Sequence, residues 1–243
     1  MRLLISVTDA AEAVEAATGG ADIIDVKDPG AGALGQASPE CVAEVRRVVP
    51  AGRPVTAALG DGPFEPSAVA RQATCLADSG ATYVKLGVRN TTPERVLTAL
   101  RVVRASLPPD VGLIVAGFAD WERAGAPRPL DLPDLARSAG ARGCLVDTAV
   151  KDGQGLFRWL DEPALRALVL ACRRLDLMCG LAGSLGSSDL ARVAGLVPDI
   201  VGIRGAACAG DRVHGRVQAD RVAGLARILR GEAVGPTALA AAT

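Results

Sequence analysis

Short apolar segments alternate with longer amphipathic segments along almost the whole chain, and this alternation restricts the possible folds more than any other feature. Eight of the apolar segments have the length and residue content of buried strands. They are residues 2–7, 22–27, 54–59, 82–87, 112–118, 143–147, 178–183 and 199–205. Strands that alternate with helices build parallel sheets from βαβ units. We therefore expect an α/β fold with eight parallel strands.

The segments between the strands carry helix signals. Ser38 with Pro39, and Thr92 with Pro93, each place an N-cap residue before a proline at the first helical position. Residues 162–175 and 188–196 repeat their apolar side chains with the helical period. These signals predict helices on the connections between strands.

A weak internal repeat favours a closed barrel. Gly20, Gly80 and Gly140 are spaced sixty residues apart, and each leads from a helical segment into a strand. Two βα units fill such a spacing, so eight units over residues 1–230 predict a single (β/α)8 TIM barrel. An open doubly wound sheet is the alternative, but it would more often have five or six strands and a G-x-G-x-x-G motif after the first. Residues 231–243 lack an amphipathic pattern, and we expect a frayed tail there.

Composition excludes several functional classes. The 243 residues contain 27 basic and 27 acidic side chains, so the basic excess typical of nucleic-acid binders is missing. No apolar run reaches the roughly 18 residues of a membrane span, and we interpret the N-terminus as a strand. Six cysteines without a C-x-x-C pair, and a single histidine, His214, argue against a zinc site. We expect reduced, mostly buried thiols and a cytoplasmic protein.

Lysine is rare in this chain, and its positions are informative. Only three of the 27 basic residues are lysines. Because strand residues alternate between faces, charged residues opposite the apolar face point into the barrel at the carboxyl ends of the strands, where barrel active sites lie. These inward residues are Asp25, Lys27, Lys85, Asp147 and Arg204. Lys151 follows in the next loop, close enough to reach the same opening.

Amine chemistry is one explanation for the three lysines. A lysine amine can lose its proton and attack a carbonyl, whereas arginine keeps its charge. Burial and the neighbouring cations Lys85 and Lys151 would lower the pKa of Lys27 and keep it nucleophilic. The alternative is a set of inward salt bridges at the barrel rim. A genomic preference for arginine codons would explain why lysine is rare elsewhere, but not why it is kept here.

Glycine-rich turns follow the last two predicted strands. In barrels, backbone N–H groups after strands 7 and 8 commonly bind phosphate. The candidates are Gly183, Ser184, Gly205 and Ala206. Ordinary tight turns are the alternative. His214 lies in a polar loop, and we expect it on the rim or in solvent rather than as a catalytic base.

Several motifs together resemble the (5-formylfuran-3-yl)methyl phosphate synthase family of methanofuran biosynthesis. They are "GGADIIDVKDP", "GATYVKLG", "VDTAVKDGQGLF", "LAGSL" and "DIVGIRGAAC". The resemblance implies a class I aldolase-like lyase that joins two molecules of glyceraldehyde 3-phosphate with loss of phosphate and water. It implies that Lys27 forms the Schiff base and that Lys85 accepts the proton. Asp25, Asp147 and Lys151 would complete the site, with no cofactor and no metal.

The composition, rich in alanine, arginine and glycine, is more typical of a high-GC bacterium than of a methanogen. The arginine-rich region around His214 also departs from the family pattern. We expect backbone N–H groups after strands 7 and 8 to hold one phosphate, and Arg204 or Lys151 the other. We also expect a homo-oligomer.

Two other functions are open at this point. One is a different lysine-dependent aldolase, such as a deoxyribose-phosphate-type enzyme, which also pairs two lysines with an aspartate. The other is a non-catalytic barrel that binds phosphorylated metabolites. Analysis of the product formed from glyceraldehyde 3-phosphate separates the synthase from another aldolase, and a borohydride trap separates an enzyme from a non-catalytic barrel.

Overall fold

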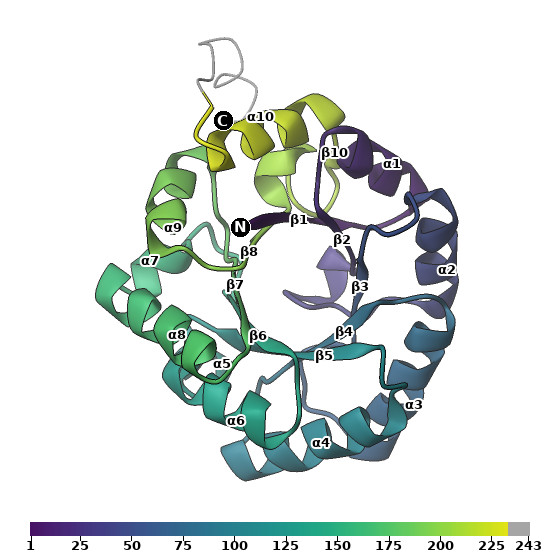
Figure 1. Cartoon of the computed structure of the whole chain (residues 1–243), viewed down its shortest axis with the longest axis vertical. Helices are drawn as coiled ribbons and strands as arrows, with labels where there is room; N and C mark the ends of the chain where they lie inside the picture. Colours follow the sequence, from purple (N-terminus) through teal and green to yellow (C-terminus); the bar gives the residue numbers. More distant parts are fainter. Residues whose placement is uncertain (233–243) are drawn as a thin grey trace.

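The computed structural model describes residues 1–232, and within them eight parallel strands close into one barrel (Figure 1). The strands pair in chain order, and the last pairs with the first. They are β1 (Arg2–Val7), β2 (Ile23–Val26), β3 (Val55–Ala58), β4 (Tyr83–Gly87), β5 (Gly112–Phe118), β6 (Gly143–Asp147), β7 (Met178–Leu181) and β8 (Ile200–Ile203). The predicted TIM barrel is confirmed, and the open-sheet alternative is wrong. The tail predicted over 231–243 lies, from residue 233 on, outside the described residues.

Helices surround the barrel as an outer ring (Figure 1). They are α1 (Ala10–Thr18), α2 (Pro39–Val48), α3 (Pro66–Asp78), α4 (Pro93–Ser106), α5 (Trp121–Ala124), α6 (Leu132–Ser138), α7 (Leu156–Trp159), α8 (Glu162–Arg174), α9 (Leu190–Leu196) and α10 (Ala219–Leu229). Short 3-10 turns are η1 (Pro29–Ala31), η2 (Pro129–Asp131), η3 (Ser187–Asp189) and η4 (Gly205–Ala207). Within residues 1–232, no helix combines the length and apolar character needed to cross a membrane.

The two predicted N-caps behave differently. Ser38 caps α2 as expected, because its hydroxyl accepts a hydrogen bond from the Cys41 N–H at 3.1 Å. Thr92 occupies the N-cap position of α4, but its side chain makes no capping hydrogen bond. The prediction is therefore right about where α4 begins and wrong about how that end is stabilised.

The repeated glycines have a common conformation. Gly20, Gly80 and Gly140 adopt positive φ angles of 89°, 97° and 69°, which end a helix and direct the chain into the next strand. The fourth unit has no glycine at this point. Val197, at the end of α9, instead takes the left-handed conformation with a φ of 55°, which a β-branched residue adopts only at a cost.

Strand alternation divides the core into two parts. Val84, Leu86 and their equivalents pack outward against the helices, in the main hydrophobic cluster. The barrel interior is filled at its amino-terminal end by Leu4, Ile23 and Ile200. Toward the carboxyl ends of the strands, polar residues replace these apolar side chains, and Asp25 lies in register between Ser6 and Thr56. The fold thus brings the charged residues of the even-numbered strands to one end.

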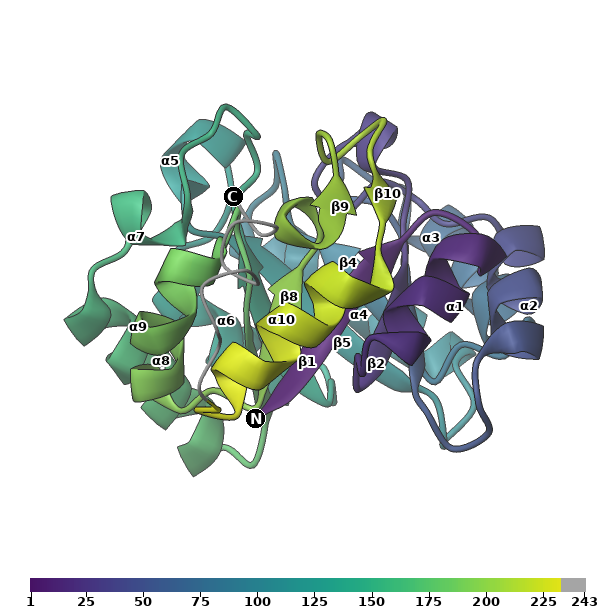
Figure 2. The ribbon, with the colours of Figure 1, turned by 90° about the horizontal axis from the view of Figure 1, so that it is seen from above.

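A small hairpin follows β8 and was not predicted. Its strands β9 (Cys208–Ala209) and β10 (Arg216–Val217) pair antiparallel. The hairpin rises beyond the carboxyl ends of the barrel strands, on the same side as η1 (Figure 2). Strands of two residues in a polar segment carry no periodic pattern, so the sequence could not indicate them.

All six cysteines are free thiols, as expected. Four are buried, Cys41 is half-buried and Cys75 is exposed.

Candidate active site

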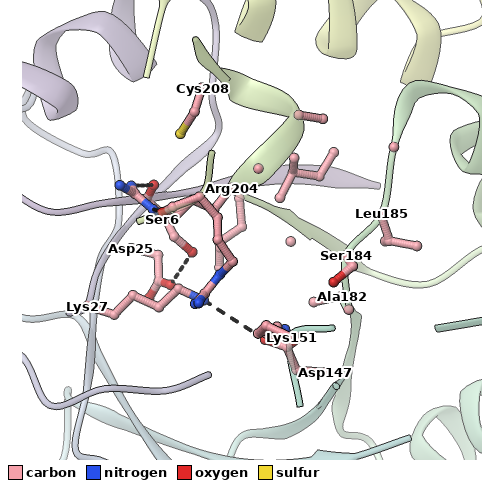
Figure 3. A pocket seen from close by; sticks show the side chains of 18 of the residues that line it. Ser6, Asp25, Lys27, Asp147, Lys151, Ala182, Ser184, Leu185, Arg204 and Cys208 are labelled. Carbon is pink, nitrogen blue, oxygen red and sulfur yellow. Dashed lines mark hydrogen bonds and ion pairs between the residues drawn. The ribbon is translucent and has the colours of Figure 1, made fainter. Parts of the chain in front are cut away.

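A cavity of about 460 Å³ opens at the carboxyl end of the barrel. All the residues predicted for the site line it: Asp25, Lys27, Lys85, Asp147, Lys151, Gly183, Ser184, Arg204, Gly205 and Ala206. Figure 3 shows Asp25 and Lys27 on one side of the space, and Asp147, Lys151 and Ser184 on the other. The volume falls within the range of about 300–1,000 Å³ typical of small-molecule sites.

Lys85 and Asp25 form a buried ion pair at the base of the cavity. The Lys85 Nζ lies 2.5 Å from the Asp25 Oδ1, and both side chains are almost completely buried. The Asp25 carboxylate also accepts hydrogen bonds from Ser6 Oγ at 2.8 Å and from Thr56 Oγ1 at 2.5 Å. Because donors from β1, β3 and β4 fix this carboxylate, it holds the Lys85 amine in one orientation.

Lys27 is less tightly paired. Its Nζ donates a hydrogen bond to the Ala33 carbonyl at 3.0 Å and lies 3.9 Å from the Asp147 Oδ2. Burial lowers the pKa of the Lys27 amine from 10.5 to about 8; the Lys85 and Lys151 charges act in the same direction, and Asp147 and Asp25 oppose them. A pKa of about 8 leaves roughly a tenth of this amine neutral at pH 7. Lys27 is thus a buried cavity lysine with a substantial nucleophilic fraction.

Asp147 joins Lys27 to Lys151. Its Oδ1 accepts hydrogen bonds from Lys151 Nζ at 2.5 Å and from the Thr148 N–H at 2.7 Å, and Lys151 also donates to Thr148 Oγ1. Burial opposes ionisation of Asp147, but the positive charges of Lys151 and Lys27 outweigh it and lower the pKa to about 2. Asp147 is therefore a carboxylate that balances two lysines.

The turns after β7 and β8 present backbone N–H groups to the cavity. Gly183 and Ser184 both have positive φ angles, of 112° and 49°. Neither their N–H groups nor those of Gly205 and Ala206 donate to any other described residue. A Cβ at Gly183 would lie 3.1 Å from the Thr148 methyl group, so this turn packs closely against the end of β6. Unpaired N–H groups in such turns can bind an anion.

Arg204 lines the cavity, but its guanidinium has other partners. The Arg204 Nη1 donates to Glu12 Oε2 at 2.8 Å and to the Ser6 carbonyl at 2.9 Å, and its Nε donates to the Arg212 carbonyl. Arg204 and Glu12 are both almost completely buried. The expectation that Arg204 holds a phosphate does not fit this geometry, because the charge is already compensated by Glu12.

Four further residues of the site were not indicated by the sequence. Ser6 and Thr56 orient Asp25, and the inward alternation of their strands could have suggested them. Arg212 and Arg221 line the cavity from the hairpin and from α10, and no periodic pattern marks them. His214 lies at the hairpin tip, 85% exposed and 3.1 Å from Asp211, which agrees with the prediction of a solvent-facing residue.

Comparison with known proteins identifies the family. Residues 3–226 match the family model described as 4-HFC-P synthase. The chain belongs to this family. A (5-formylfuran-3-yl)methyl phosphate synthase of Methanococcus maripaludis is 42% identical over 236 residues, which cover 95% of this chain and 100% of the relative. A Streptomyces griseus subsp. griseus protein, provisionally assigned to the same synthase, is 43% identical over 230 residues, covering 92% of each chain.

Solved structures similar to this 4-HFC-P synthase family member include enzymes named for sugar phosphates. A phosphoribosyl anthranilate isomerase from Thermus thermophilus gives a TM-score of 0.59 at 17% identity, covering 95% of this chain and 99% of that one. A 3-hexulose-6-phosphate synthase from Salmonella typhimurium gives 0.62 at 16% identity, covering 96% and 100%. At these identities the likeness concerns the fold. Within residues 1–232, no group of three or more His, Cys, Asp or Glu side chains is arranged to hold a metal ion.

Proposed function

We propose that this protein condenses two molecules of glyceraldehyde 3-phosphate into (5-formylfuran-3-yl)methyl phosphate by a lyase mechanism like that of class I aldolases. The observation that carries the proposal is the buried Lys27 amine, with its pKa lowered to about 8, in the same cavity as the Lys85–Asp25 pair. One lysine is suited to attack a carbonyl, and the other is held in place beside it. The relatives that are named (5-formylfuran-3-yl)methyl phosphate synthase support this choice of product.

The first steps use the two lysines in turn. The neutral Lys27 amine adds to the aldehyde of the first triose phosphate, and loss of water gives an iminium ion that withdraws electrons from the neighbouring carbon. Lys85 removes the proton from that carbon, and an enamine forms. The electron pair of the enamine then expels the phosphate on the third carbon, because that carbon lies next to the former carbanion.

The remaining steps join the second triose. The second triose phosphate first isomerises to its ketone form, dihydroxyacetone phosphate, as a proton moves from its second carbon to its first. The species left after loss of phosphate then attacks this ketone through its third carbon and forms the carbon–carbon bond, which places the CH2–phosphate group at position 3 of the future ring. Ring closure, dehydration and hydrolysis from Lys27 then release the furan aldehyde, whose phosphate comes from the second triose. Overall, two triose phosphates lose one phosphate and two waters, so the scheme requires no oxidant or reductant. Asp25 and Asp147 are positioned to pass protons between the lysines and the substrate.

The turns after β7 and β8 are suited to hold one phosphate. Gly183, Ser184, Gly205 and Ala206 offer N–H groups, and Lys151 adds a positive charge on the β6 side. No group in this scheme has to be a metal or an organic cofactor. The cytoplasmic location and the homo-oligomer stay predictions.

The deciding experiment is incubation with glyceraldehyde 3-phosphate, followed by mass spectrometry and near-ultraviolet absorbance of the product. We expect a conjugated furan aldehyde phosphate, and inorganic phosphate in equal amount. Borohydride added during turnover should leave a mass adduct on Lys27. A sugar phosphate formed without release of phosphate would instead indicate another lysine-dependent aldolase. Absence of both product and adduct would indicate a non-catalytic barrel.

A further inference from the structure

The cavity wall carries more positive charge than its own carboxylates balance. Its cationic side chains are Lys27, Lys85, Lys151, Arg204, Arg212 and Arg221, and its carboxylates are Asp25 and Asp147. Asp25 is paired with Lys85, and Asp147 serves Lys27 and Lys151 together. Glu12, behind the wall, compensates Arg204. Arg212 and Arg221 have no carboxylate within ion-pair distance among the described residues.

Arg212 is held rigidly at the cavity opening. Its Nη1 donates to the Pro29 carbonyl at 3.1 Å and its Nη2 to the Gly32 carbonyl at 3.2 Å. Its own carbonyl accepts the hydrogen bond from Arg204 Nε at 2.6 Å. Arg212 therefore spans from the β9–β10 hairpin to the loop after β2, the two segments that lie side by side in Figure 2. Carbonyl partners fix the guanidinium but leave its charge uncompensated.

Arg221 reaches the same cavity from the first turn of α10. Its guanidinium makes no hydrogen bond or ion pair with another described residue. Arginine is the side chain best suited to bind a phosphate with two parallel hydrogen bonds. Both uncompensated arginines thus have the chemistry of an anion site.

We propose that Arg212 and Arg221 form a second anion subsite, which binds the phosphate monoester of the second triose. This inference rests on the proposed function, in which two phosphorylated substrates occupy the cavity during one turnover. The turns after β7 and β8, with Lys151, can serve one phosphate, and a second dianion requires cations of its own. The two arginines are the cavity cations that no described carboxylate already compensates.

Binding of the first and of the second triose phosphate can be measured separately. The first molecule forms the Lys27 adduct, and the second is needed only for formation of the furan. We would measure both the trapped adduct and the furan rate over a range of glyceraldehyde 3-phosphate concentrations. In Arg221→Gln, half-maximal adduct formation should need the same concentration as in the wild type. Half-maximal furan formation should need about tenfold more, the equivalent of about 1.4 kcal/mol. Arg212→Gln should shift the same curve. Arg221→Gln separates a binding effect from misfolding, because the Arg221 guanidinium makes no hydrogen bond or ion pair within residues 1–232 that the substitution would remove.

Arg227→Gln is the matched control, since Arg227 lies on the same helix and does not line the cavity; it should leave both curves unchanged. The inference is overturned if the arginine variants shift the adduct curve, which would assign them to the first triose, or if they shift neither curve. Failure of the proposed function itself would be seen earlier, because the wild type would then form neither adduct nor furan.

Discussion

At the scale of single residues, Lys27 combines a cost in stability with a chemical advantage. Burying an amine among two other lysines favours its neutral form, and lowering its pKa from 10.5 to about 8 corresponds to roughly 3 kcal/mol. The same neutral form is the one that attacks a carbonyl. A residue kept only for stability would not be a lysine in this position.

Lys27→Met should therefore stabilise the protein while removing the borohydride adduct. Asp147 keeps Lys151 as its partner in this variant, so no carboxylate is left unpaired. We expect the free energy of unfolding at pH 7 to rise by about 1 kcal/mol or more, as measured by urea denaturation. A loss of stability would mean that Lys27 contributes to the fold through its contacts with Ala33 and Asp147.

The contribution of Lys27 to the free energy of unfolding depends on pH. Between pH 8 and pH 10.5 the folded Lys27 has lost its proton while the unfolded chain retains it, so the unfolded state binds more protons. The stability contributed by this group therefore rises with pH in that window. The advantage of Lys27→Met over the wild type should shrink from pH 7 to pH 10, whereas the rate of adduct formation in the wild type should rise, with a midpoint near pH 8. An adduct rate that is flat across this range would contradict the assignment of Lys27 as the attacking amine.

Lys85→Gln separates proton removal from Schiff-base formation. Lys27 is still present in this variant, so borohydride should still trap the substrate on Lys27. Furan formation should fall by roughly two to four orders of magnitude, the usual contribution of a positioned acid–base group. Exchange of the substrate α-hydrogen with deuterated solvent, followed by mass spectrometry, should slow equally. Exchange at the wild-type rate would move the role of the base to Asp147 or Lys151.

At the scale of secondary-structure elements, the residue that ends the helix before each even-numbered barrel strand is glycine in three repeats and a different residue in the fourth. Three units use glycine in the left-handed conformation before the strand, and the fourth uses Val197. Val197 is 58% exposed, so it gains little from burial in return for this backbone conformation. A left-handed residue with a Cβ costs about 1–2 kcal/mol.

Val197→Gly should raise the free energy of unfolding by about 1 kcal/mol, because glycine adopts this conformation without a steric penalty. Thermal or urea unfolding checks this. Val197→Ala is the matched control, because alanine also has a Cβ and should recover less than half of the gain. An equal gain for both variants would assign the effect to the exposed valine side chain instead.

Much of this element-level organisation could be predicted, because it depends on local period. The alternation of faces placed Asp25, Lys27, Lys85 and Asp147 at one end of the barrel, and the structure confirms that they share a cavity. The partner of each side chain could not be predicted in the same way. The alternation correctly predicts that Arg204 points into the barrel. It does not predict the ion pair with Glu12, because the two residues are 192 positions apart in the sequence. The hairpin that carries Arg212 is likewise too short to leave a periodic signal.

At the scale of the whole molecule, the Glu12–Arg204 pair connects the first βα unit to the last strand. It lies beside the junction where β1 pairs with β8 and the barrel closes. Burial opposes ionisation of Glu12, but the hydrogen bond and charge of Arg204 outweigh it and hold the pKa of Glu12 below its usual 4.5. This contribution to stability is present above pH 4.5 and is lost as the pH falls through the lowered pKa.

Arg204→Met should destabilise the protein by roughly 3–5 kcal/mol, because it leaves the Glu12 carboxylate buried without its partner. Urea unfolding at pH 7 measures this. The double variant Glu12→Leu/Arg204→Met should recover most of the loss, since neither charge then remains buried. If Arg204→Met keeps its stability and instead raises the concentration of triose phosphate needed for turnover, Arg204 is a phosphate ligand after all.

The closure of the ring also sets an order of events during synthesis. Lys27 and Lys85 leave the ribosome early, but the strand that seals the barrel, and Arg212 above its opening, come more than a hundred residues later. Until then β1 has an unpaired edge that could pair with another nascent chain. Lys27 therefore stays hydrated on the growing chain, where its ordinary pKa of 10.5 keeps the amine protonated at neutral pH. The fraction of neutral Lys27 amine, and with it the reactivity of this lysine toward aldehydes, should therefore rise when the barrel closes around it.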